Sequence, residues 1–154
     1  MQIRHQISGR LRSVLIELVS MEDYKMITKS RFFFNWKTEK QYQVYKLSII
    51  GDKEILGLMS LEHFRNEKRL EIKLLAVSRE NRGKHKKYEG IAGNLIAYAC
   101  REAIRLYAEN ACVSLIPKDI IRNHYMKKYG MMDAGRQIFL EGLPLLRLLR
   151  TYKV

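Results

Sequence analysis

The segment with the clearest chemical character is a strand-like stretch that leads through a basic, glycine-containing loop into a helical pattern. The stretch EIKLLAVS covers 71–78, the loop RENRGKHKKYEG covers 79–90, and the helical pattern starts at Ile91. A loop that enters a helix presents unpaired backbone N–H groups and the positive end of the helix dipole. Gly90 and Gly93 let a ligand approach the backbone closely, and neighbouring Lys and Arg side chains add positive charge. The segment therefore predicts a phosphate-binding site.

Several kinds of loop bind phosphate groups in this way. The chain has no G-x-G-x-x-G fingerprint of dinucleotide-binding proteins and no G-x-x-x-x-G-K-S/T P-loop. The preceding strand also follows a predicted hairpin, because apolar-rich runs at 42–50 and 54–61 are joined around Gly51-Asp52. With 71–77 as a third strand, the sequence predicts an antiparallel meander before the loop, not a βαβ unit.

The remaining elements follow from periodicity and capping residues. Apolar residues at 91–107 recur at helical spacing, and Gly130 is placed to end a helix that starts near Asp119. The other predicted elements are strands at 11–19, 111–116 and 135–140 and helices at 21–30 and 144–152. The aromatic cluster at 32–36 is interpreted as a core plug. The predicted fold class is mixed α/β, with a central sheet of antiparallel and parallel pairs flanked by helices.

Length and composition predict one globular domain over 1–154. Of the 154 residues, 47% are hydrophobic and 29% are charged, and there is no linker or internal repeat. The net charge of +13 attracts polyanions such as nucleic acid, anionic membrane surfaces or phosphate-bearing cofactors. The positive residues are spread along the chain and are densest from Arg79 to Lys87.

The cysteines and the N-terminal residues bear on location. Cys100 and Cys112 lack metal-ligand spacing and do not make a disulfide framework, so we expect two reduced thiols. The first residues, MQIRHQISGR, lack an apolar signal core, and no apolar run is long enough to span a membrane. We expect a cytoplasmic protein that has no membrane as a partner.

Two motifs resemble those of the GNAT superfamily of N-acetyltransferases. Residues 87–92, KYEGIA, resemble its pyrophosphate loop Q/R-x-x-G-x-G/A, with Lys87 in place of Gln or Arg. Residues 123–131, NHYMKKYGM, resemble the end of a later helix of the family, with Tyr125 one residue before the position of the family's tyrosine. The resemblance covers 44–140 and implies a GNAT-like fold.

The resemblance implies acetyl-CoA as the acetyl donor, with no metal, in a wedge between the strands at 71–77 and 111–116. Its pantetheine arm would pair with the backbone at 75–77, and its pyrophosphate would meet the N–H groups of 88–93. The implied cofactor-binding residues are Leu75, Ala76, Val77, Lys87, Tyr88, Glu89, Gly90, Ile91, Ala92 and Gly93.

The resemblance also implies direct attack of a primary amine on the thioester. An alkyl ammonium group has a pKa near ~10.4, so a base or a water chain must remove its proton. Glu71 lies near the strand carboxylate that serves as this base in some family members, although Lys73 on the same strand face could simply pair with it. Tyr125 is the implied general acid for the leaving thiolate, and its alternative role is that of a half-buried core tyrosine.

Two other functions fit the same residues. A basic nucleic-acid-binding module would use the charge and could stack bases on the aromatic cluster at 32–36, although no known binding motif is present. A GNAT scaffold that binds CoA without catalysis would fit the displaced Tyr125. The expected partners are acetyl-CoA, an amine acceptor that is a small molecule or a protein, and weakly bound nucleic acid or ribosome, and an oligomer is compatible with the sequence.

Overall fold

The computed structural model describes residues 1–154, which divide into two compact units. Unit 1 comprises Met1–Ser60 and Leu74–Leu95, and unit 2 comprises Leu61–Lys73 and Ile96–Val154. Three elements contribute residues to both units: β4 (Ile55–Phe64), β5 (Arg69–Val77) and α2 (Ile91–Tyr107). The prediction of a single domain stays a prediction.

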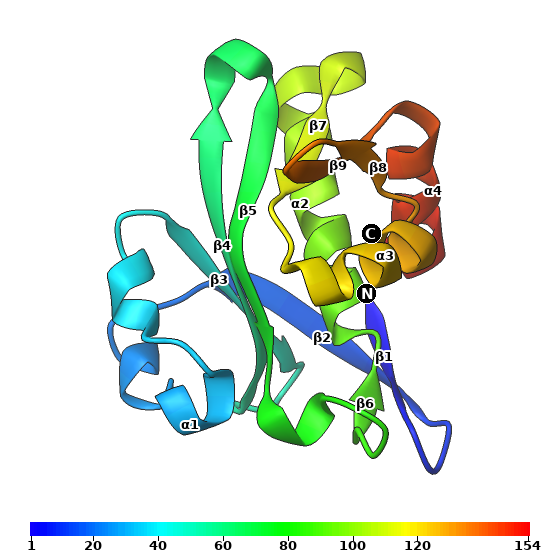
Figure 1. The fold of residues 1–154 in the computed structure, drawn as a ribbon. Coiled ribbons are helices and arrows are strands. Elements are labelled where there is room, and N and C mark those ends of the chain that lie inside the picture. The colour runs from blue at the N-terminus through cyan, green and yellow to red at the C-terminus, as the bar shows by residue number, and fades with distance from the viewer. The chain divides into compact units, whose positions relative to one another are not determined.

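The sheet of unit 1 has the strand order β6-β1-β2-β3-β4-β5. Its remaining strands are β1 (Gln2–His5), β2 (Leu11–Leu18), β3 (Gln43–Ile49) and β6 (Tyr88–Glu89). β1 pairs antiparallel with both β2 and β6, and β2 pairs antiparallel with β3. Figure 1 shows β6, drawn in green, beside the blue β1–β2 hairpin, so two segments far apart in the sequence meet there.

The core of unit 1 is built around the aromatic cluster. Phe32 is 0% and Trp36 is 2% exposed, and both pack with Val44, Ile55 and Leu58. The indole Nε1 of Trp36 donates to the carbonyl oxygen of Phe32 over 3.2 Å, so its polar atom is satisfied inside the core. The interpretation of these two aromatic residues as a core plug is confirmed.

The helix predicted at 21–30 is wrong. The chain forms a single 3₁₀ turn at Asp23–Lys25 and then a short helix α1 (Lys29–Phe32). The Asp23 carboxylate accepts hydrogen bonds from the Ser20 N–H and from Lys46 Nζ, and Thr28 starts the second helix by accepting from the Arg31 N–H. Asp23 therefore holds its turn to Ser20 and Lys46, and Thr28 caps α1, so two separate local arrangements take the place of one continuous helix.

Unit 2 holds the parallel part of the mixed sheet, in the strand order β4-β5-β7-β9-β8. The new strands are β7 (Cys112–Leu115), β8 (Met132–Ala134) and β9 (Gln137–Glu141). β7 pairs parallel with β5, and β9 pairs antiparallel with both β7 and β8. Helices α3 (Asp119–Tyr129) and α4 (Gly142–Tyr152) complete the unit, and α4 packs on β9.

The elements with strong periodicity lie where the sequence predicts them. α2 and α3 have the predicted bounds 91–107 and 119–129, and Gly130 ends α3 with a φ of 72°. The predicted mixed sheet with flanking helices is confirmed. No helix is both long and apolar enough to cross a membrane.

Candidate functional site

The entrance to α2 in unit 1 is the predicted phosphate-binding segment. Gly90 has a φ of 99°, a left-handed conformation that strains any residue with a Cβ, and α2 begins at the next residue. The side chain of Asn94 is fully buried behind this turn, and its Nδ2 donates to the carbonyl oxygens of Gly90 (2.7 Å) and Gln2 (2.8 Å). The turn is thus fixed from behind, which leaves the N–H groups of the first helical turn without intrahelical acceptors.

The start of α2 packs closely on β4, beside the end of β5. A Cβ on Gly57 of β4 would lie 2.7 Å from Cγ2 of Ile91 and 3.6 Å from the carbonyl oxygen of Ala76. Only a glycine at this position of β4 allows the helix to come so close to the sheet. Ala76 and Ile91, two of the residues predicted to bind the cofactor, are therefore neighbours around Gly57.

The end of β5 has a free edge. All four residues of β7 are used in pairs with Arg69–Ile72, so β7 has no residue left to pair with 73–77. The backbone of 75–77 therefore lacks a strand partner on the edge opposite β4. An extended ligand with amide groups can add to such an edge as a further strand does.

Tyr88 and Glu89 have a structural role in addition to their predicted one. Both lie in β6, in register with His5 and Arg4 of β1. The N–H of Tyr88 donates to Oδ1 of buried Asn81 over 2.8 Å, so it is not open to a phosphate group. Of the predicted segment 88–93, the first turn of α2 is therefore the part best placed to bind an anion.

The loop before β6 is ordered by its own contacts. Asn81 Nδ2 donates to Ser78 Oγ, and the Lys87 N–H donates to the carbonyl oxygen of Glu80. The guanidinium groups of Arg79 and Arg82 lie over the ring of Phe33, at 5.3 Å and 4.0 Å from its centroid. The basic loop is thus attached to the aromatic cluster by cation–π contacts, while the head groups stay close to solvent.

In unit 2, Glu71 is the centre of a partly buried ion network. It is 5% exposed, its Oε1 accepts from Arg69 Nη1 (3.2 Å) and its Oε2 accepts from Lys73 Nζ (2.8 Å). The hydrogen bond to Glu71 raises the pKa of Lys73, whereas burial lowers it. The net effect is a raised pKa, which favours the charged ammonium form of Lys73. The pairing of Glu71 with Lys73 that the sequence allowed is confirmed, and both carboxylate oxygens are occupied.

Arg69 is the residue of this network that the sequence did not reveal. Its Nη1 also donates to Ser114 Oγ of β7 (2.7 Å) and to Gln137 Oε1 of β9 (3.3 Å). Its guanidinium lies 4.2 Å from the ring centroid of Phe64. One arginine therefore connects three neighbouring strands and holds the Glu71 carboxylate in place.

Tyr125 lies in the middle of α3. Its ring centroid is 5.6 Å from that of Tyr129 and 6.1 Å from that of His124. Tyr129 is buried, whereas Tyr125 is half-buried, so Tyr125 is the one of the pair that a substrate can reach. Arg122, three positions before Tyr125, holds α3 to the β8–β9 turn, because its Nη2 donates to Asp133 Oδ1 (2.6 Å) and to the carbonyl oxygen of Gly135 (2.7 Å).

The two thiols are free and unreactive. Burial raises the pKa of Cys112 to about 11, with a further contribution from Glu141, and burial raises the pKa of Cys100 still more. Neither residue therefore forms a thiolate in appreciable amount near neutral pH. No group of three or more His, Cys, Asp or Glu side chains is arranged to hold a metal ion.

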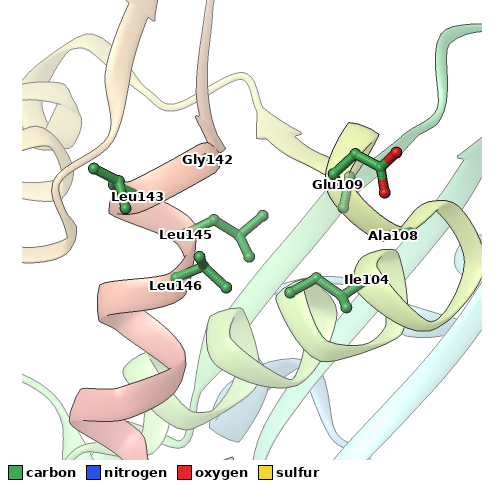
Figure 2. A pocket seen from close by; sticks show the side chains of 8 residues that line it. Ile104, Ala108, Glu109, Gly142, Leu143, Leu145 and Leu146 are labelled. Carbon is green, nitrogen blue, oxygen red and sulfur yellow. The ribbon is translucent and has the colours of Figure 1, made fainter.

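Unit 2 has a hollow that was not predicted from the sequence. It measures about 230 Å³ and lies between the C-terminal end of α2 and the start of α4, as Figure 2 shows. Leu145 and Leu146 of α4 face Ile104 across it, and Leu143 and Glu109 also belong to its lining. It contains none of the predicted site residues.

The predicted residues thus fall into two groups. The residues predicted to bind the cofactor belong to unit 1, where the end of β5 and the start of α2 meet around Gly57. The predicted catalytic residues, Glu71 and Tyr125, belong to unit 2.

Solved structures with this fold include several acetyltransferases. A Bacillus subtilis acetyltransferase in complex with CoA matches with a TM-score of 0.60 and 15% identity, over 85% of this chain and 100% of that chain. A mutant spermidine N-acetyltransferase from Vibrio cholerae matches with a TM-score of 0.62 and 12% identity, over 90% of this chain and 98% of that chain. The ribosomal-protein-S18-alanine N-acetyltransferase from Escherichia coli matches with a TM-score of 0.57 and 12% identity, over 82% and 92%.

No protein-family model matches the sequence, and no curated protein matches it by sequence. The likeness is therefore one of structure, and it agrees with the order of strands and helices described above. The chain has the fold of the GNAT N-acetyltransferases, as the two sequence motifs predicted.

Proposed function

We propose that this protein is an acetyl-CoA-dependent N-acetyltransferase that transfers the acetyl group to a primary amine. The observation that carries the proposal is the combination of a free edge at 75–77 with the glycine turn at the start of α2. This combination occurs in a chain whose fold is shared with an acetyltransferase solved with CoA and with a toxin solved with acetyl-CoA.

The residues present fit the chemical groups of CoA. The pantetheine arm carries amides, which suit the unpaired backbone of Leu75, Ala76 and Val77. The N–H groups of Ile91, Ala92 and Gly93 suit the pyrophosphate, because a helix N-terminus favours anions. Gly93 is buried and Ala92 is half-buried, so no large side chain shields these N–H groups. Lys87 is exposed and adds a mobile positive charge.

Acetyl-CoA, when bound, supplies the acetyl thioester. The amine nitrogen forms a bond to the carbonyl carbon, the carbon–sulfur bond breaks, and the sulfur leaves as a thiolate that takes a proton. We assign the donation of that proton to Tyr125, the half-buried hydroxyl of α3. Because Cys100 and Cys112 are not thiolates near neutral pH, direct transfer to the amine is favoured over an acetyl-cysteine enzyme.

Glu71 is the less well supported of the two predicted catalytic residues. A base must accept a proton from the ammonium group, and both oxygens of Glu71 already accept from Arg69 and Lys73. Removal of the amine proton through a water chain therefore fits the structure as well as direct transfer to Glu71. Glu71 would then help to hold β5, β7 and β9 together through Arg69.

The location of the protein is part of the same proposal. Both thiols are free, which fits the reducing cytoplasm. The acceptor is an amine of a small molecule or of a protein.

Calorimetric titration of the purified chain with acetyl-CoA tests this function. Dephospho-CoA and free adenosine serve as controls, and each titration is run at moderate and at high salt. We expect one-to-one binding that adenosine does not reproduce and that survives high salt, because backbone contacts supply much of the affinity. Binding that high salt abolishes, and that any polyphosphate reproduces, would refute the proposal.

A screen of amine acceptors then tests catalysis. Release of free CoA thiol that depends on an added amine supports the transferase. Tight binding of acetyl-CoA with no turnover on any small amine, peptide or ribosomal protein would instead indicate a scaffold that binds CoA without catalysis.

A further inference from the structure

The structure gathers positive charge from two distant parts of the sequence onto one ribbon of unit 1. Because β6 pairs with β1, the loop before β6 runs beside the β1–β2 hairpin (Figure 1). We call the cations of this surface the basic ribbon, and they are Arg4, Arg10, Arg12, Arg82, Lys84, Lys86 and Lys87. The segments 1–12 and 82–89 hold these seven cations and a single carboxylate, a net +6 out of the +13 of the whole chain.

The charge of the basic ribbon is not neutralised within the protein. Only Lys86 lies within 4 Å of a carboxylate, that of Glu89 at 3.8 Å. Most of these cations are exposed, and Arg12 and Lys86 are half-buried. Elsewhere in unit 1, Arg31 is paired with Glu54 and Glu80, and Lys46 with Asp23. The cations of the basic ribbon therefore lack the carboxylate partners that Arg31 and Lys46 have, and most of their charge faces solvent.

The hairpin that carries three of the cations is ordered in advance. The His5 N–H donates to the carbonyl oxygen of Arg10 (2.8 Å), and the Gly9 N–H donates to that of His5 (2.9 Å). The N–H groups of Ser8 and Arg10 donate to His5 Nδ1 (3.1 Å) and Ser8 Oγ (3.2 Å). A ligand that binds here does not have to order the turn, so less entropy is lost on binding.

Cations occupy both faces of the hairpin. Arg4 is in register with Leu11, and Arg12 is in register with Ile3. Since neighbouring residues of a strand point to opposite faces, Arg4 and Arg12 lie on opposite sides of the ribbon. β6 and β3 flank the two strands, and the buried side chain of Ile3 shares the side of Arg12, so the side of Arg4 and the tip of the hairpin are the parts most open to a ligand. The open cations of the hairpin and of the neighbouring loop can contact successive phosphate groups of a nucleic-acid backbone.

We propose that the basic ribbon binds the phosphate backbone of nucleic acid. Four of its seven cations are arginines, whose guanidinium groups bind phosphate oxygens in pairs. The proposed contact is to the phosphate backbone, because the net positive charge favours phosphate groups whatever the sequence of the nucleic acid. The proposal is independent of acetyl transfer, since binding alone is its readout.

The alternative partner is an anionic membrane. A substitution at one residue distinguishes a membrane from nucleic acid as the partner. Ile7 at the tip of the hairpin is 94% exposed, and an apolar tip among cations would insert into a bilayer. Nucleic acid gains little from such a side chain. Ile7→Ser should therefore leave binding to nucleic acid unchanged and weaken binding to anionic vesicles.

The test compares two triple variants of the full chain by fluorescence anisotropy. The first carries Arg4→Gln, Arg10→Gln and Arg12→Gln. The matched control, called the α4 triple variant, removes the same charge from exposed positions in α4 and directly after it through Arg147→Gln, Arg150→Gln and Lys153→Gln. The probes are a labelled RNA hairpin, a labelled DNA duplex, and vesicles with anionic lipid, each over a range of NaCl concentrations. Unchanged affinity for acetyl-CoA shows that the ribbon variant is folded.

We expect the ribbon variant to bind RNA or DNA at least about tenfold more weakly than the native chain at moderate salt. Its plot of log K against log salt should be shallower by about 2 to 3, since each lost phosphate contact removes about 0.9 from the slope. The control variant should change the affinity by less than about threefold.

Three results would overturn the proposal. The first is equal loss of affinity in both triple variants, which would mean that total charge alone is responsible. The second is absence of binding to both nucleic acids at low salt. The third is tighter binding to vesicles than to nucleic acid, together with weaker vesicle binding in Ile7→Ser. That result would identify a membrane site.

Discussion

Asp23 carries an ion pair that links the segment after β2 to β3. Its carboxylate is 5% exposed and accepts from Lys46 Nζ (2.7 Å), the Ser20 N–H (2.8 Å) and Ser20 Oγ (2.9 Å). Burial alone would raise the pKa of Asp23, but the hydrogen bonds from Lys46 and Ser20 outweigh it and hold the pKa below its ordinary value. The ionised carboxylate is therefore a stabilising group of unit 1.

The substitution Asp23→Asn should lower the free energy of unfolding by about 1–3 kcal/mol near neutral pH, because it leaves Lys46 partly buried without its main partner. A lowered pKa stabilises the fold above the unfolded-state value of about 3.9, and this contribution disappears as the pH falls through the folded-state value. Denaturant unfolding over a pH series measures the effect. The difference between the native chain and the variant should be constant above about pH 5 and shrink in acid. A difference that persists in acid would contradict the ionic explanation.

Tyr125 gives the sharpest test of chemistry at a single residue. If its hydroxyl protonates the leaving sulfur, Tyr125→Phe should lower kcat by about 10²- to 10⁴-fold and leave the Kd for acetyl-CoA unchanged. Steady-state kinetics with the acceptor found in the screen measure the first, and calorimetry the second. Tyr107→Phe on α2 is the matched control, since Tyr107 is also half-buried. An unchanged kcat in Tyr125→Phe would leave Tyr125 with a packing role beside Tyr129.

The sequence could predict the network around Glu71 only in part. Lys73 lies two positions along the same strand, so its pairing with Glu71 follows from the alternation of a strand. The further contacts of Arg69 reach Ser114 and Gln137, and no local pattern places those residues beside β5. Only the pairing of strands brings them together.

At the scale of elements, helices with a clear period and the short apolar strands β7 and β9 were predictable, whereas β1 and β6 were not. α2 has its predicted bounds because its apolar residues recur on one face and Gly90 precedes it. β1 and β6 are too short to show alternation, and they form because each supplies the other's backbone partners. The involvement of Tyr88 in β6, and of its N–H with Asn81, therefore had no signal in the sequence.

The contact between β4 and α2 makes a prediction at this scale. In Gly57→Ala, the new Cβ would lie 2.7 Å from Ile91 Cγ2 and 3.0 Å from Leu95 Cδ1, so the helix must move away from the strand. Such overpacking should lower the free energy of unfolding by about 1–3 kcal/mol and weaken acetyl-CoA binding, because the first turn of α2 is displaced. Denaturant unfolding and calorimetry measure the two effects.

Two further variants isolate the cause. Ser13→Ala, at an exposed position of β2, should be nearly neutral. The double variant with Gly57→Ala and Ile91→Ala should lose less free energy of unfolding than the two single variants lose in sum. The reason is that removal of Cγ2 from Ile91 relieves the clash with the new Cβ. Additive losses would show that the two residues are not in contact.

At the scale of the whole molecule, the dominant feature is the excess of positive charge, and its arrangement has a consequence for stability. Two cations about 10 Å apart in water repel each other by about 0.4 kcal/mol. Among the seven cations of the basic ribbon, only Lys86 has a carboxylate within 4 Å that offsets such repulsion. This repulsion is exposed and is screened by salt, whereas the ion pairs of Glu71 and Asp23 are mostly buried and are screened much less. Added salt should therefore stabilise the fold and not weaken it.

We accordingly expect the Tm of the native chain to rise when NaCl is increased from about 20 mM to about 200 mM. The triple variant Arg4→Gln, Arg10→Gln and Arg12→Gln should have a higher Tm than the native chain at low salt, and the difference should vanish at high salt, where the Debye length falls below the spacing of the cations. The α4 triple variant has the same net charge as the ribbon variant but keeps the cations of the basic ribbon. Its rise in Tm over the native chain at low salt should therefore be smaller. Thermal unfolding of the three proteins at both salt concentrations measures this. An equal rise in Tm in the two triple variants at low salt would mean that repulsion is spread over the molecule. A fall in the Tm of the native chain with added salt would mean that its ion pairs outweigh the repulsion within the basic ribbon.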